Sequence, residues 1–221
     1  MRKFALLAAA ALAATATPAL AQTVSYGGTS YSPTQDIVID YTGVQFPGGT
    51  GTLTLTFDGI SGNDYLFTYS LLNTSTDPFT NISGFGFNVT GGTIDFATTT
   101  STGDFGNISS GSISGGAFVD FCATAGPNCA GGSNGGPTPG ETGTGTLSLE
   151  FTSLTDAITL SNPIIRMQNA GPDGQGSDIG TPGGGPPLPE PATWAMMLVG
   201  FGATGFALRR SRKNALLTQI A

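Results

Sequence analysis

The sequence contains no histidine, and its few basic residues are concentrated at the two ends of the chain. Between residues 22 and 188 there is no lysine, and Arg166 is the only arginine. These absences exclude Ser-His-Asp triads, Cys-His dyads, Ser-Lys pairs, Schiff-base lysines and histidine-ligated zinc from this region. Paired carboxylates are the remaining route to catalysis, and no two of them can be matched in space from the sequence. We therefore expect a noncatalytic protein that needs no cofactor.

Acidic residues dominate the same region. All fourteen acids of the chain except Glu190 lie between residues 22 and 188, which gives this region a net charge of about −12. Such a charge repels phosphate backbones and anionic lipid headgroups, so we expect no nucleic acid as a partner, and peripheral membrane binding is disfavoured. The plainer interpretation is that the acids keep a Gly- and Thr-rich surface soluble.

Short runs of β-branched, aromatic and threonine residues recur about every ten residues, divided by Gly, Asn, Asp and Pro. No long apolar stripe with the helical period occurs among them. The pattern predicts an all-β fold, an antiparallel β-sandwich of jelly-roll or immunoglobulin-like type with eight or nine strands. The expected strands are residues 36–41, 51–57, 65–72, 82–89, 93–97, 117–121, 145–151, 157–160 and 164–168.

Two Gly- and Pro-rich segments depart from the strand pattern. Residues 129–145 have too few apolar groups to order themselves by burial, so we expect a flexible loop there. Residues 180–188 have a similar composition and are expected to form a spacer after the last strand. The predicted β-sandwich body therefore covers residues 22–179.

The N-terminus has the pattern of a secretory signal peptide. Arg2 and Lys3 form a basic start, residues 4–14 are apolar, and Ala19-Leu20-Ala21 is an A-x-A cleavage site for signal peptidase. We expect residues 1–21 to be removed, so that the mature protein begins at Gln22 and is exported.

The only two cysteines, Cys122 and Cys129, flank the turn-forming sequence Gly126-Pro127-Asn128. In an exported chain an even pair at this spacing favours a disulfide, which closes a loop of about eight residues and contributes roughly 2.5 kcal/mol in the chain-entropy model. A metal site is the alternative, but it lacks ligands because there is no third cysteine and no histidine. We expect no metal at this pair.

The C-terminal region combines four features in a fixed order. Pro189-Glu190-Pro191 is followed by Trp194, by an apolar run over residues 195–208, and by a basic cluster made of Arg209, Arg210, Arg212 and Lys213. As a helix, residues 192–208 would span roughly 25 Å, a little less than the hydrocarbon core of a bilayer. The order of features resembles the PEP-CTERM sorting signal, in its PEPxxWA variant, of Gram-negative bacterial surface proteins. An ordinary single-pass tail anchor is the alternative, although such an anchor needs no Pro-Glu-Pro.

The resemblance implies a route for the protein. An exosortase-type transpeptidase of the inner membrane would recognise the sorting signal, residues 189–213, and would cut at or near the tripeptide. Before that cut, a single transmembrane sorting helix would hold the protein transiently in the inner membrane, with residues 214–221 as a cytoplasmic tail. After it, the body would reach the cell surface or the extracellular matrix, where exopolysaccharide is a candidate partner.

A second resemblance concerns the body. The export signal, the cysteine turn and the segment of residues 166–178 are similar to PEP-CTERM proteins of the cistern family. This resemblance implies no activity.

Two further kinds of site remain open in the body. Asp173, Gln175, Ser177 and Asp178 place oxygen side chains among glycines, which is a partial match to a calcium loop, and an ordinary Gly/Asp turn is the alternative. A carbohydrate-binding module would need exposed aromatic residues on one sheet face, and the candidates are Tyr26, Tyr31, Tyr65 and Tyr69. A carboxylate-dependent glycosidase would need two acids facing one cleft.

Overall fold

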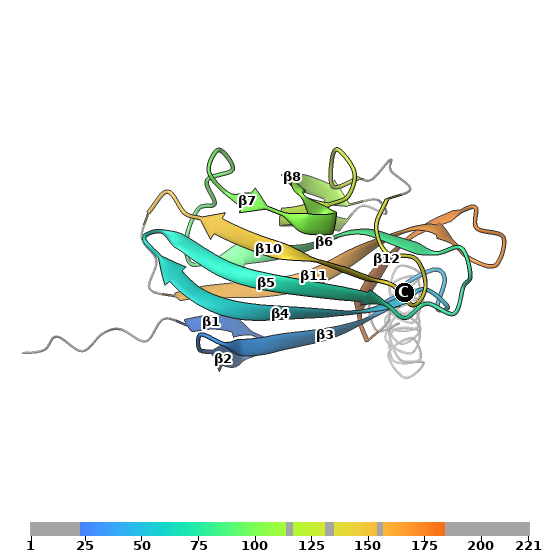
Figure 1. The fold of residues 1–221 in the computed structure, drawn as a ribbon, viewed down its shortest axis with the longest axis horizontal. Helices are drawn as coiled ribbons and strands as arrows, with labels where there is room; N and C mark the ends of the chain where they lie inside the picture. The colour runs from blue at the N-terminus through green and yellow to red at the C-terminus, as the bar shows by residue number, and fades with distance from the viewer. Residues whose placement is uncertain (1–22, 114–116, 131–134, 154–156, 184–221) are drawn as a thin grey trace, which may run out of the picture.

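The computed structural model describes residues 23–113, 117–130, 135–153 and 157–183. These ranges contain β-strands and one short 3-10 helix, and no α-helix (Figure 1). The expected all-β class is therefore confirmed for this part of the chain. In chain order the elements are β1 (Thr23–Tyr26), β2 (Thr29–Tyr31), β3 (Gln35–Gly43), β4 (Thr50–Ser61), β5 (Asp64–Asn73), β6 (Asn81–Thr90), β7 (Thr100–Ser101), η1 (Gly103–Phe105), β8 (Asn107–Ile113), β9 (Ala117–Thr124), β10 (Thr142–Glu150), β11 (Ala157–Ala170) and β12 (Gly176–Pro182).

Alternating side chains explain why the central strands form and which way they face. In β4, Leu53, Leu55 and Phe57 are buried, and the threonines between them lie on the opposite face. Burial alternates in the same way along β5, which pairs antiparallel with β4. Because successive side chains of a strand point to opposite faces, each strand presents one apolar face to the core and one polar face to solvent.

Aromatic side chains fill much of the core. Tyr69 of β5, Phe85 of β6 and Phe105 of η1 form a cluster whose ring centroids lie 5.2 to 5.8 Å apart, with Phe85 edge-on to the other two rings. Edge-to-face pairs of this kind add stabilisation beyond the area that they bury. The cluster joins strands from opposite sides of the core, so these long-range contacts hold the two halves of the fold together.

The strands form one continuous sheet rather than the two sheets of a sandwich. Hydrogen-bonded neighbours follow the order β7-β10-β5-β4-β3-β12-β11-β6-β9-β8, and β1 pairs in parallel with β11 and antiparallel with β2. Strand β12 joins the two halves because it pairs with β11 on one side and with the end of β3 on the other. The end strands of this path, β7 and β8, are connected through η1, so the sheet curls nearly closed around its core (Figure 1). The mostly antiparallel pairing is confirmed, and the division into two sheets is corrected.

Several strand predictions also need correction. The structure adds β1, β2, β7, β8 and β12, which are short or rich in Ser and Gly and therefore carry little hydrophobic pattern. Residues 93–97 form no strand, and only an isolated bridge joins Ile94 to Phe151. The two strands expected at residues 157–160 and 164–168 form one strand, β11, with an irregularity beside Pro163, which has no N–H group for the ladder.

The described part of the segment expected as a flexible loop, residues 135–145, is bonded into the fold. The side-chain amide of Asn73 donates hydrogen bonds to the carbonyl oxygens of Thr80 and Pro137, at 2.9 and 2.8 Å. The N–H of Ile82 donates to the same Pro137 oxygen at 3.1 Å. Gly136 has φ +99°, and a Cβ there would lie 1.9 Å from the Ile82 oxygen, so only glycine fits. Hydrogen bonds, rather than the burial of apolar side chains, hold these residues in place. The expected flexibility is therefore wrong for them.

Several predicted segments lie outside the described residues. They are the signal peptide at residues 1–21, the sorting signal at residues 189–213 and the tail at residues 214–221. Strand β12 continues to Pro182, so the sheet includes the first residues of the predicted spacer. Among the residues that the structure does describe, no helix is long and apolar enough to cross a membrane.

For two buried tyrosines, we expect replacement by phenylalanine to change the free energy of unfolding in opposite directions. No described residue hydrogen-bonds the hydroxyl of Tyr41, and its burial raises the tyrosine pKa well above the usual value. The Tyr69 hydroxyl instead donates to the Thr102 oxygen and accepts the Phe105 N–H. We expect Tyr41→Phe to raise the free energy of unfolding by about 1 kcal/mol and Tyr69→Phe to lower it by a similar amount. Urea unfolding of the two variants tests this, and changes of the same sign would contradict it.

Candidate functional site

The main candidate site arises where β6 and β9 separate. Their ladder ends at the pair Phe87 and Phe121. Beyond it, the Val89 N–H donates to Asp120 Oδ2 at 3.0 Å, and the Asp120 N–H donates to Asn88 Oδ1 at 3.2 Å. Beyond the last ladder pair, these side-chain hydrogen bonds connect the two strands. The widened end of this strand pair opens a pocket at the surface.

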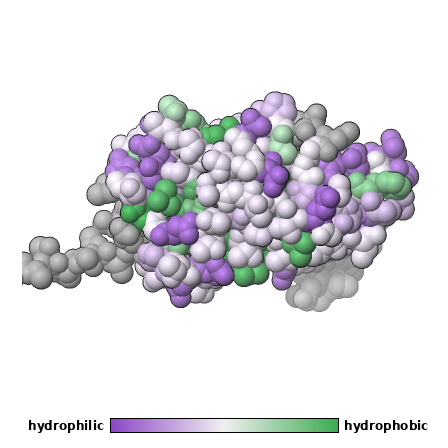
Figure 2. Space-filling model, in the orientation of Figure 1, coloured by the Kyte–Doolittle hydropathy of each residue, from purple (hydrophilic) through white to green (hydrophobic). Residues whose placement is uncertain are grey.

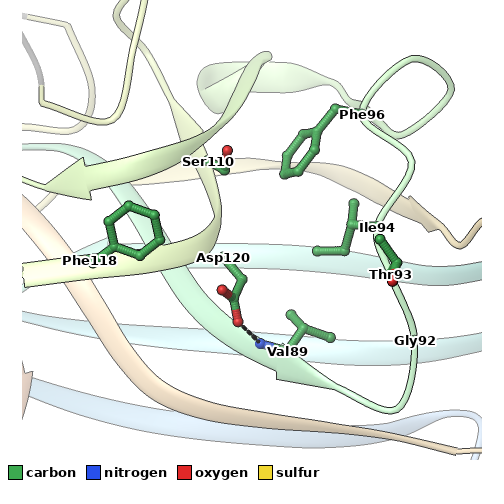
Figure 3. A pocket seen from close by; sticks show the side chains of 8 residues that line it. All are labelled: Val89, Gly92, Thr93, Ile94, Phe96, Ser110, Phe118 and Asp120. Atoms are coloured by element: carbon green, nitrogen blue, oxygen red, sulfur yellow. Dashed lines mark hydrogen bonds between the residues drawn. The ribbon is translucent and has the colours of Figure 1, made fainter.

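The pocket has a volume of about 390 Å³ and a mixed aromatic and polar lining (Figure 3). Phe118 projects from β9 with 62% of its surface exposed, and Phe96 projects from the loop after β6 with 38% exposed. In Figure 3 these two rings flank the pocket, and Asp120 lies below them with its carboxylate toward Val89. The lining residues are Val89, Gly92, Thr93, Ile94, Phe96, Ser110, Phe118 and Asp120.

This lining favours binding over catalysis. It offers two aromatic surfaces, one carboxylate and hydroxyl groups, which is the usual composition of a small-ligand site. One carboxylate is too few for the paired mechanism of a glycosidase. No group of three or more Cys, Asp or Glu side chains that could hold a metal ion occurs in the described ranges.

A second pocket brings two carboxylates together. Asp104 and Glu141 both line it, beside Gly136, Pro137, Thr142 and Gly143. Glu141 accepts hydrogen bonds from the Thr138 N–H and from the Thr138 hydroxyl, at 3.0 and 2.8 Å, and these bonds lower its pKa. Asp104 accepts a bond from the Thr144 N–H at 2.7 Å. A general acid needs a raised pKa, so the environment of Glu141 opposes that role.

The tyrosines expected on an exposed face lie elsewhere. Tyr65 and Tyr69 are each 1% exposed and belong to the core, so their prediction as ligand-binding residues is wrong. Tyr26 and Tyr31 are partly buried beside the core at β1 and β2. All four tyrosines therefore contribute to the largely aromatic core or pack against it.

The exposed aromatics that sequence reasoning missed are Phe96 and Phe118, which line the pocket, and Phe79, which lies outside it. A signal for Phe118 is present in Ala-Phe-Val-Asp-Phe, residues 117–121, where alternation assigns Val119 and Phe121 to one face and Phe118 to the other. Both faces carry a large apolar residue, and only one of them can be the core face. The loop position of Phe96 carries no comparable signal.

The calcium candidates do not converge on one point. Asp178 is buried, and its Oδ2 accepts hydrogen bonds from the N–H groups of Gln45 and Phe46 at 2.9 and 2.8 Å. The neighbouring Ser177 is exposed on the opposite face of β12, and Asp173 and Gln175 are exposed in the preceding turn. Asp178 therefore fixes the turn after β3, and the four oxygens do not form one cation site.

Cys122 and Cys129 form the expected disulfide, with Cα atoms 5.9 Å apart. Both cysteines are buried, and they pack with Ile113, Val119 and Ile164 in a small cluster separate from the main core. The bridge therefore stabilises the connection after β9 and the sheet surface beneath it.

We expect Cys122→Ser to lower the free energy of unfolding by roughly 2.5 kcal/mol while the main core stays folded. The bridge closes a short loop and lies outside the main cluster, so its loss acts mostly on that loop. Urea unfolding and near-UV circular dichroism provide the measurement, and a Cys122→Ala/Cys129→Ala variant controls for the free thiol. Alkylation of native wild-type protein at two thiols would contradict the disulfide.

Comparison with known proteins identifies the C-terminal pattern. A family model of the PEP-CTERM protein-sorting motif matches residues 187–213. The chain carries a PEP-CTERM sorting motif. No curated protein and no solved structure matches the chain. The motif implies an exported protein that an exosortase processes and that reaches the cell surface or the extracellular space.

The PEP-CTERM match contains every residue proposed for sorting, which are Pro189, Glu190, Pro191, Trp194, Arg209, Arg210 and Arg212. It does not extend into the body, so the resemblance to the cistern family stays a prediction. Six residues separate the end of β12 at Pro182 from Pro189.

The single base of the body is buried rather than presented at the surface. Arg166 of β11 is 6% exposed, and no described residue accepts a hydrogen bond from its Nε or Nη1. Burial lowers its pKa, and the nearby charge of Asp178 opposes that change. The described surface of this PEP-CTERM protein therefore carries acids with no exposed base, which disfavours anionic ligands.

Proposed function

We propose that this chain is a noncatalytic surface or extracellular-matrix protein, associated with exopolysaccharide or biofilm. An exosortase-type transpeptidase would process it at residues 189–191. The observation that carries the proposal is the PEP-CTERM match at residues 187–213, which joins the tripeptide to the apolar run and the arginine cluster.

The described body suits an extracellular setting. Its outer sheet face over β3, β4 and β5 carries threonines hydrogen-bonded to aspartates, in the pairs Thr52 with Asp40, Thr56 with Asp36 and Thr68 with Asp58. In Figure 2 the surface over the central strands is mostly pale, and apolar side chains form small separate patches. A polar exterior without large apolar patches keeps an exported domain soluble, and the disulfide is typical of an oxidising compartment.

The proposed route has two cleavages. Signal peptidase removes residues 1–21 after Ala21, following the Ala19-Leu20-Ala21 site. The apolar run and basic cluster then hold the chain in the inner membrane with the body on the outer side. The second cut, at or near Pro189-Glu190-Pro191, releases the body from this anchor.

Expression in the native host and in a strain without its exosortase tests the proposal. We expect the wild-type strain to place a shortened protein in the surface or medium fraction. The deletion strain is expected to keep an uncut form, longer by the sorting segment, in the inner membrane. Identical masses and fractions in the two strains would contradict processing by this enzyme.

Carbohydrate binding is the second candidate function, and the pocket beside Phe96 and Phe118 favours it. A carboxylate-dependent glycosidase has less support because the lowered pKa of Glu141 opposes proton donation. A reducing-sugar assay on the mature protein separates these two classes, since only a glycosidase releases new reducing ends.

A further inference from the structure

We infer that the pocket between β6, β8 and β9 binds a neutral pyranose glycan, with Phe118 and Phe96 contacting the sugar rings and Asp120 accepting a hydrogen bond from a sugar hydroxyl. This inference deepens the second candidate function, carbohydrate binding, and does not depend on how the C-terminus is processed.

The two phenylalanines supply apolar surfaces of the right kind. A pyranose ring presents C–H groups on its faces and hydroxyl groups around its edge, so it packs its faces on aromatic rings and bonds through its edge. Phe118 is 62% exposed although the buried residues Val119 and Phe121 follow it in β9, and Phe96 is 38% exposed in the loop after β6. They lie on either side of one pocket, where a ligand ring would contact both (Figure 3).

Asp120 is held ready to accept a hydrogen bond. Its Oδ2 accepts the Val89 N–H, and its own N–H is fixed by Asn88 Oδ1, so both the backbone and the carboxylate have defined positions. The orientation therefore costs little additional side-chain entropy when a ligand binds. Among the described residues, none donates a hydrogen bond to Oδ1, which leaves that oxygen for a ligand hydroxyl. Ser110 and Thr93 add hydroxyl groups to the lining.

The charge of the site selects a neutral ligand. A uronic acid or a sulfated sugar would bring its charge against Asp120 and against a body whose one base, Arg166, is buried. A quaternary ammonium ligand is the competing idea, because carboxylates and aromatic rings also attract cations. Two phenylalanines form a poor cage, since cation–π attraction is strongest with tryptophan, whereas the hydroxyl groups of Ser110 and Thr93 match a polyol.

Saturation-transfer NMR on the mature protein purified from the native host tests the inference. The probes are cellotetraose, maltotetraose and mannotetraose, with tetragalacturonate as the anionic counterpart and choline as the cationic one. We expect saturable binding of at least one neutral tetrasaccharide at or below about 10 mM and none of tetragalacturonate. No neutral binding in that range, or choline as the only ligand, overturns the inference.

Matched variants locate the binding. Phe118→Ala is expected to weaken binding of the neutral glycan about tenfold, in line with the loss of one aromatic contact. Phe79→Ala is the control because Phe79 is 55% exposed but lies outside the pocket, and it should leave affinity unchanged. Asp120→Asn keeps an oxygen for the Val89 N–H and should weaken binding severalfold.

Urea midpoints of the three variants confirm that each one folds. Equal effects of Phe118→Ala and Phe79→Ala would place the ligand elsewhere and overturn the assignment. The same variants leave the PEP-CTERM motif untouched, so a failure here is distinguishable from a failure of processing, which intact mass reports.

Discussion

Replacing Pro189-Glu190-Pro191 with three alanines is expected to leave export intact and to trap a longer protein in the inner membrane. The signal peptide is unchanged, so the body still crosses the membrane. The apolar run and the cluster containing Arg209 and Arg210 still anchor the chain, and the processing enzyme no longer recognises its motif. Intact-mass measurement and fractionation in the native host check this result.

A matched control changes two residues just before the motif. Gly184→Ala/Gly185→Ala alters the segment upstream of the PEP-CTERM match and should be processed like the wild type. A permanent tail anchor would give the same uncut membrane form for all three proteins. That outcome would contradict exosortase processing.

The largest stability effect is expected from Asn73→Asp. Asn73 is fully buried, its amide donates to the Thr80 and Pro137 oxygens, and its Oδ1 accepts the Ser75 N–H at 3.0 Å. An aspartate there turns two donors into an acceptor facing two carbonyl oxygens, and it buries a charge without a partner. We expect the free energy of unfolding to fall by at least about 3 kcal/mol, because uncompensated buried charges cost that much.

Urea unfolding at neutral pH measures this loss. Asn107→Asp is the control, since Asn107 is exposed on β8 and the change there should stay within about 0.5 kcal/mol. Protection of amide hydrogens over residues 135–141 should fall in Asn73→Asp, because Asn73 bonds that segment to the sheet. Similar urea midpoints for the two variants would show that the hydrogen bonds of Asn73 contribute little to the stability of the fold.

The strands with strong local patterns could be predicted from the sequence. In β4 the alternation of threonine with Leu53, Leu55 and Phe57 predicts both the strand and the face that it turns to the core. The joining of the two halves into one continuous sheet could not be predicted in this way. It depends on β12, whose residues are mostly Gly, Ser and Thr and whose partners β3 and β11 are distant from each other in sequence. Composition carries no information on such pairings.

The C-terminal motif could be predicted from the sequence, and the pocket could not, because only the motif is made of neighbouring residues. The PEP-CTERM motif is contiguous, so its residue order alone identifies it. At the pocket, Asn88 and Asp120 make side-chain hydrogen bonds between β6 and β9, and Phe118 and Phe96 come from a strand and a loop that are separate in the sequence. These contacts join residues about thirty positions apart, and the polar side chains that make them look like ordinary surface residues in the sequence.

The most direct test of the proposed sorting is the intact mass of the wild-type protein isolated from the cell surface or medium of its native host. We predict a chain that begins at Gln22 and ends at or near Pro189-Glu190-Pro191, without Trp194 and without Arg209, Arg210 and Arg212. A surface protein whose mass still includes Trp194 and the arginine cluster would contradict processing at the PEP-CTERM motif.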